Sequence, residues 1–381
     1  MRIKIKYILL SLLVAVPFPE ANAQDTVAFK GQLSAYTHFN GSNDLPWMSG
    51  VRYIPQFNFG HRWNDQRLFD LEASANLFGN VGVKLFDKSD FSGDIKPYRL
   101  WTRYSTNQFE LRAGLQKINF GSASLLRPLM WFDQIDPRDP LKLTDGVWGL
   151  LARYYFLNNA NIWLWGLYGN ENLKGWEAIR SKKNIPEFGG RLQLPLPKGE
   201  GGLSFHHRVA DGSTLPDSLM AADNIPENRV GFDAKFDMVV GWWIEASWSN
   251  YTAETGNYPN QEAINLGIDY TFGIGNGLTV IYEQLITSID QNPFEFGNVT
   301  TLSLLNLTYP VGLFDNLSAI VYYDWTKNKA YNFLTWQRQF NKLTFYLMGY
   351  INPKEYYIPT QGSGEMLYAG NGIQVMLVFN H

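Results

Sequence analysis

The sequence contains no cysteine among its 381 residues. Disulfide bonds and thiolate metal ligands are therefore excluded, so the fold must be held by backbone hydrogen bonds and packing. Charge is nearly balanced, with 32 basic against 35 acidic residues. This balance gives no basic excess of the kind that a nucleic-acid partner requires. The serine-hydrolase motif Gly-x-Ser-x-Gly and the zinc motif His-Glu-x-x-His are also absent, and no cofactor is expected.

Long apolar runs are missing as well. After the first 23 residues there is no run of 18 apolar residues, the length that a membrane-spanning helix needs. Yet 45% of the residues are hydrophobic and 15% are aromatic, while the mean hydropathy is −0.22. The apolar residues are dispersed at every second position, which is the pattern of strands in a transmembrane β-barrel.

The first 23 residues have the features of a secretory signal peptide. Three basic residues precede an apolar run over residues 7–16, and Ala21-Asn22-Ala23 has the small-x-small form of a cleavage site. The apolar run is too short to cross the roughly 30 Å hydrocarbon layer as a helix. We expect cleavage after residue 23, which leaves a single barrel domain over residues 24–381.

Two segments, residues 109–116 and 148–156, illustrate the alternation. Apolar residues of the first segment alternate with Glu110, Arg112 and Gln116. Because successive side chains of a strand point to opposite sides, each set occupies one face. In a soluble sandwich the apolar face would pack on a second sheet. In an outer-membrane barrel it faces lipid, and the polar face lines a wet lumen.

Connections of two lengths alternate along the chain. The short ones are rich in Gly, Pro and Asn, the residues that form tight turns. This alternation predicts an all-β, antiparallel, up-and-down transmembrane barrel of 18 strands, with 16 as the alternative, short periplasmic turns and long extracellular loops. Short connections are expected at residues 105–108, 157–160, 195–201, 239–241, 273–277, 310–316 and 340–342, and long ones at 40–50, 79–97, 120–145, 170–186, 211–228, 250–261, 288–297 and 352–369.

Outward aromatic residues gather beside the short connections. Strand propensity explains aromatic residues in strands, but not their clustering at one end. We interpret the cluster as an interfacial girdle, in contact with outer-membrane lipid and lipopolysaccharide. Phe379 also resembles the terminal aromatic residue that the barrel-assembly machinery recognises, although two residues follow it. The girdle comprises Tyr104, Phe156, Tyr270, Phe272, Tyr309 and Phe379.

Charged residues on the opposite strand faces are the predicted pore-lining residues. The arginines come from the fourth to tenth strands and the carboxylates from the second half of the chain. This separation would produce a transverse field, which orients dipolar solutes and sets ion preference. Alternatively, the charges pair across strands and support the wall. The residues are Arg99, Arg103, Arg112, Arg153, Arg191, Arg208, Arg229, Asp233, Asp269, Glu283 and Asp324.

The connection Phe120–Asp145, of 26 residues, is the predicted constriction loop. It contains six large apolar residues between positions 125 and 132, so it is too apolar to remain in water. Structureless loops longer than about 15 residues are usually functional or disordered. The loop either folds into the barrel mouth and narrows the pore or packs on the rim. Its charged residues are Arg127, Asp136, Arg138 and Asp139.

One segment resembles a known family. Residues 114–121, with sequence GLQKINFG, are followed by Asp136-Pro137, Asp139-Pro140 and residues 144–147, with sequence TDGV. This arrangement is similar to a segment of large outer-membrane porins akin to the alginate-export family. The resemblance implies an 18-stranded barrel that passes anionic polysaccharide or other solutes.

Together these features favour a non-enzymatic outer-membrane channel for passive diffusion of small hydrophilic solutes, anionic ones included, or oligosaccharides. A structural or adhesive barrel without an open pore is the alternative. A barrel hydrolase is a further alternative, for which Ser204 and His206 share a strand face. Residues two apart on a strand lie about 7 Å apart, too far for a bond between nucleophile and base.

Overall fold

The computed structural model describes residues 25–64, 66–214, 223–252, 259–355 and 368–381. The predicted signal peptide lies outside these residues. Within them the chain forms 18 strands and one short 3-10 turn, Gly212–Thr214. The strands are β1 Asp25–Asn40, β2 Trp47–Asn64, β3 Arg67–Lys84, β4 Lys88–Ser105, β5 Phe109–Gln116, β6 Val147–Tyr155, β7 Asn161–Leu167, β8 Glu187–Leu196, β9 Gly199–Asp211, β10 Asn224–Asp237, β11 Gly241–Tyr251, β12 Asn260–Phe272, β13 Leu278–Asp290, β14 Val299–Pro310, β15 Asp315–Asp324, β16 Lys329–Gln339, β17 Leu343–Ile351 and β18 Asn371–Asn380. No helix of the described residues is long and apolar enough to cross a membrane.

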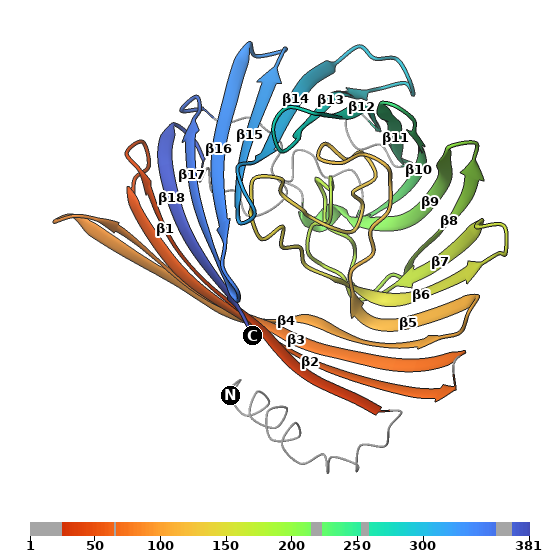
Figure 1. The fold of residues 1–381 in the computed structure, drawn as a ribbon. Helices are drawn as coiled ribbons and strands as arrows, with labels where there is room; N and C mark the ends of the chain where they lie inside the picture. The colour runs from red at the N-terminus through yellow and green to blue at the C-terminus, as the bar shows by residue number, and fades with distance from the viewer. Residues whose placement is uncertain (1–24, 65, 215–222, 253–258, 356–367) are drawn as a thin grey trace.

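Every strand pairs antiparallel with its neighbours in sequence, and the first strand pairs with the last (Figure 1). Strand β1 meets β18 over nine residue pairs, from Gln32↔Asn380 to Asn40↔Gly372. The sheet therefore closes on itself, so that every strand has a neighbour on both sides. The predicted fold class and strand number are confirmed.

Burial is inverted relative to a soluble protein. On β9, Leu203 and Phe205 are 57% and 42% exposed, whereas the polar Ser204 between them is buried and His206 and Arg208, which follow, are fully buried. The same exposure of alternate apolar side chains recurs on most strands. An apolar exterior around a polar interior is what a barrel in lipid requires.

One predicted loop is instead a β-hairpin. Residues 79–97 were expected to form a long connection, but β3 and β4 are 18 residues each and leave only residues 85–87 between them. Residues 325–328, on the same rim as the long connections, form a second short turn. Residues 87–94 contain four charged residues and a glycine, residue types that are depleted in strands. However, outward Val81, Phe91 and Ile95 alternate with polar residues and extend the strand pattern.

Candidate functional site: the barrel lumen

The predicted constriction loop lies inside the barrel, where Figure 1 shows it coiled within the ring of strands. It contacts the inward faces of β10, β11 and β13. The hydroxyl of Ser122 donates a hydrogen bond to Asp233 Oδ2 (2.7 Å). The indole N–H of Trp131 donates to Ser247 Oγ (3.0 Å).

Two buried carboxylates hold the backbone of this loop. Glu245 of β11 accepts hydrogen bonds from the N–H groups of Ala123 (2.8 Å) and Leu129 (2.6 Å). Glu283 of β13 accepts from Ser124 (2.7 Å) and Leu126 (2.6 Å), and also from Leu125 and the Trp243 indole. Both carboxylates are fully buried. Their oxygens thus satisfy amides that the loop would otherwise bury without a partner.

Gly121 allows this close approach. Its φ of +105° falls in the region that favours glycine. A Cβ at this position would lie 2.4 Å from Glu245 Oε2. A side chain would therefore push the loop away from β11.

The predicted charges of the loop stabilise the loop itself. Arg127 forms a buried ion pair with Asp133 (3.2 Å) and donates to the Phe120 carbonyl (2.8 Å). Arg138 pairs with Asp136 (2.6 Å). These side chains fix the internal shape of the loop.

Asp139, the last predicted charge of the loop, closes a turn. It accepts hydrogen bonds from the N–H groups of Leu141 (2.9 Å) and Leu143 (3.3 Å). Burial raises the pKa of Asp139, and the two N–H groups offset part of that rise.

A second connection, residues 168–186, also packs into the lumen. Its Lys174 pairs with Glu187 of β8 (2.8 Å), and its Glu177 pairs with Arg229 of β10 (3.0 Å). Arg208 of β9 joins the same buried network through Glu227 and Glu177. The network balances three cationic and three anionic side chains, as buried ions require.

Several predicted pore-lining residues are therefore covered rather than open to solvent. They lie on strands as predicted, and the constriction loop was one that could fold into the barrel mouth, but no local pattern indicated that residues 168–186 would cover them too. The covered residues, each at most 5% exposed, are Arg191, Arg208, Arg229, Asp233 and Glu283. Arg191 and Asp233 form an ion pair.

The wall formed by β3 to β6 retains partly exposed charges. Arg103 pairs with Asp70 of the neighbouring strand (2.9 Å). Arg103, Arg112 and Arg153 all lie within 3.6 Å of carboxylate oxygens of Glu110. The side chains of the three arginines are 28%, 15% and 16% exposed, so solvent reaches this group.

Aromatic rings border the same wall. The Arg112 guanidinium lies 4.7 Å from the Trp101 ring centroid, and that of Arg153 lies 3.7 Å from Trp163. Such contacts hold a guanidinium in place while leaving its donors available. Arg99 is buried at the upper end of the wall and donates to the Thr144 carbonyl (2.9 Å).

The charges are less segregated than the sequence suggested. Six of the seven predicted arginines form ion pairs with carboxylates, all except Arg99. Pairing across strands thus describes them better than a basic wall facing an acidic one. Asp324 accepts N–H bonds from Thr326 and Lys327 in the β15–β16 turn. Asp269 is partly buried beside Gly241.

The histidine and serine weighed for hydrolysis have other partners. His206 contacts the Trp165 indole N–H through Nδ1 (3.2 Å) and Glu187 through Nε2 (3.2 Å). Ser204 accepts a hydrogen bond from Arg191 (3.1 Å). His206 and Ser204 therefore form hydrogen bonds with different residues. In the described part of the chain, no group of three or more His, Asp or Glu side chains has the spacing of a metal site.

No family model and no curated protein matches the chain. The resemblance to the alginate-export family is therefore not confirmed. Solved outer-membrane porin structures do match in fold. Pseudomonas aeruginosa OpdQ aligns with a TM-score of 0.58 at 9% identity, over 94% of this chain and 99% of OpdQ. Acinetobacter baumannii OccAB4 aligns with a TM-score of 0.54 at 11% identity, over 95% of this chain and 99% of OccAB4. Salmonella typhi OmpF, in complex with daunomycin, aligns with a TM-score of 0.52 at 9% identity, over 95% of this chain and 99% of OmpF.

At these identities the likeness establishes the fold alone. The chain has the porin-like architecture of a closed 18-stranded antiparallel barrel. Its apolar exterior and closed sheet are those of a multi-pass β-barrel of the outer membrane.

Proposed function

We propose that the chain is an outer-membrane channel for the passive diffusion of small hydrophilic solutes, with a preference for anions or anionic oligosaccharides. The partly exposed wall of β3 to β6 carries this proposal. Arg99, Arg103, Arg112 and Arg153 stand there against Asp70, Glu72 and Glu110. These seven side chains carry one net positive charge when the buried Arg99 is counted, and the three partly exposed arginines present guanidinium groups that suit carboxylate and phosphate ligands.

The inward loop supports a constriction on the opposite side. Its hydrogen bonds to β10, β11 and β13 and the packing of its aromatic residues against β6 and β7 hold it in the lumen, facing β3 to β5. Solutes would then pass between the loop and the partly exposed arginines. In this arrangement the loop sets the width of the passage and the arginines set its charge preference.

A closed lumen would favour the structural or adhesive alternative. Eleven buried residues form an apolar cluster that joins β12 to β17 with the inward loops, including Leu126 of the constriction loop. This packing fills part of the lumen. A barrel hydrolase has less support, since Ser204 and His206 bond to different groups.

Single-channel conductance in a planar bilayer tests the proposal. The refolded protein is placed under a tenfold KCl gradient, and the reversal potential is read. We expect open steps with a reversal potential shifted toward chloride. A shift toward potassium would reject the anion preference, and a folded barrel without conductance would reject the channel and favour an adhesive role.

A further inference from the structure

The rim of the barrel has a step between β4 and β5. Strands β2, β3 and β4 are 18 residues long, whereas β5, β6 and β7 have 8, 9 and 7 residues. Strand β4 pairs with β5 only over Leu100–Ser105. Above that point it pairs with β3 alone, and no strand of the described residues covers the other edge of residues 88–98. The extended hairpin is visible in Figure 1.

Backbone groups on this edge lack strand partners. The N–H groups of Phe91 and Ile95 donate to the side chains of the preceding Asp90 (2.9 Å) and Asp94 (2.8 Å). These amides therefore do not belong to the β3 ladder. Because alternate residues of a strand direct their N–H groups to the same edge, Gly93 shares this edge. An edge of this kind is a template for an added strand.

The outer face of the hairpin is apolar beyond the height of the membrane. Phe91 and Ile95 are 77% and 67% exposed. The outward positions of β3 run from Phe69 to Val83, about 46 Å at roughly 3.3 Å per residue. With a strand tilt of about 40°, this corresponds to a height of about 35 Å, against an apolar band of about 25 Å. Lipid therefore cannot cover the whole face.

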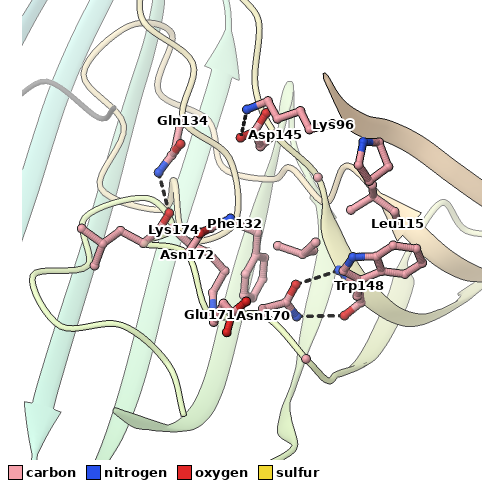
Figure 2. Close-up of a pocket in the computed structure, with 15 residues that line it drawn as sticks. Lys96, Leu115, Phe132, Gln134, Asp145, Trp148, Asn170, Glu171, Asn172 and Lys174 are labelled. Atoms are coloured by element: carbon pink, nitrogen blue, oxygen red, sulfur yellow. Dashed lines mark hydrogen bonds and ion pairs between the residues drawn. The ribbon is translucent and has the colours of Figure 1, made fainter. Parts of the chain in front are cut away.

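A cavity of about 230 Å³ lies at the foot of the edge (Figure 2). Lys96 and Pro97 of β4 form one side of it, and Phe132 and Asn172 come from the two inward connections. Trp148 of β6 contributes a further side. Lys96 is held there by an ion pair with Asp145 (2.6 Å). A cavity of about 150 Å³ is known to hold benzene, so this one has room for an aromatic side chain, with Leu115 and Trp148 as apolar contacts and Gln134 and Asn172 as polar ones.

We infer that the β4 edge, residues 88–97, and this cavity together form a docking site for an extended segment of a partner protein. The segment adds a strand to β4 and inserts one aromatic side chain into the cavity. Edge hydrogen bonds then give affinity, and the cavity gives specificity. When the segment binds, the Phe91 and Ile95 amides leave the side chains of Asp90 and Asp94 and donate to the added strand. Basic residues of the segment would then pair with the two freed carboxylates.

A second copy of this chain does not fit the edge. Two identical strands that pair antiparallel are related by a two-fold axis perpendicular to their sheet. In a barrel wall that axis lies in the membrane plane, so one copy would be upside down. Two copies in one membrane share their orientation, so their β4 edges cannot pair antiparallel with each other, and we take the partner to be a different protein.

A designed peptide serves as the probe. Its sequence, Trp-Glu-Val-Lys-Val-Ser-Val-Lys-Thr, places Trp at the cavity, valines opposite Phe91, Gly93 and Ile95, and lysines opposite Asp90 and Asp94. Fluorescence anisotropy of the labelled peptide is measured with the refolded full chain in detergent. We expect saturable binding, at least tenfold weaker when the three valines are N-methylated, and also weaker when Trp is replaced by Ala.

Protein variants complete the test. Phe91→Pro and Ile95→Pro remove edge amides without removing a bond to β3, and each should weaken binding at least tenfold. A heat-dependent shift in electrophoretic mobility verifies that each variant is folded. Asp87→Ala, at the hairpin tip, is the matched control and should bind as the parent does. Absence of saturable binding, equal binding by the N-methylated peptide, or equal binding by empty micelles would overturn the docking site.

Discussion

At the scale of single residues, two carboxylates fasten the inward loop to the wall. Glu283 accepts hydrogen bonds from three consecutive backbone amides, and Glu245 accepts from two others. Leaving buried donors unsatisfied costs on the order of 1–3 kcal/mol for each group. The two carboxylates are therefore strong anchors of the loop, beside the buried apolar packing of its aromatic residues.

Replacement of Glu283 by Ala should release the loop. The amides of residues 124–126 lose their acceptor, so we expect larger and noisier single-channel currents. Asp269→Ala is the control, because Asp269 lies on the adjacent strand β12 and no bond to the loop is seen. An equal change in both variants would argue against a specific anchor at Glu283.

Charge preference should also depend on individual side chains. The double substitution Arg112→Gln with Arg153→Gln removes two positive charges from the β3–β6 wall. We expect the reversal potential in a KCl gradient to move toward potassium. Arg338→Gln provides a matched control near the short turn at residues 340–342, where Arg338 pairs with Asp315. An unchanged reversal potential in the double variant would exclude this wall as the selectivity element.

At the scale of elements, the local residue pattern identified the strands, whereas long-range packing determined where the loops lie. Alternation of apolar and polar residues identified the strands, because neighbouring side chains of a strand always point to opposite faces. The same rule missed the upper part of the β3–β4 hairpin, which contains Asp, Lys and Gly, residue types that are depleted in strands. Nothing local distinguished a loop that folds inward from one that stays on the rim.

Deletion of residues 124–138 should increase conductance. The loop occupies space within the barrel, and its removal exposes Glu245 and Glu283 to a wider passage. A deletion within residues 291–298, on the same rim, is the control, because that connection bonds to its own strand ends through Asp290. Unchanged conductance after the first deletion would refute the constriction.

At the scale of the whole molecule, the barrel concentrates its charges within a narrow interior. Interactions between exposed charges are screened over a Debye length of about 10 Å at 0.1 M salt and about 3 Å at 1 M. The partly exposed arginines should therefore influence passing ions less as salt increases. We expect the chloride-to-potassium permeability ratio to approach one between 0.1 and 1 M KCl. A ratio independent of salt would indicate that buried groups set the selectivity.

The sequence by itself determined the barrel. The two-residue period, the alternation of short and long connections and the number of strands are local properties, readable from neighbouring residues. They sufficed for the closed antiparallel fold and its apolar exterior.

Only the tertiary structure decided which charges meet solvent. Ala123 bonds to Glu245, 122 positions away, and Ser124 bonds to Glu283, 159 positions away. Contacts at such separations arise when the barrel closes and brings a loop against distant strands. They bury Arg191, Arg208 and Arg229 while leaving Arg103, Arg112 and Arg153 partly exposed. The short-range alternation that defines a strand is identical for both groups, so it could not separate them.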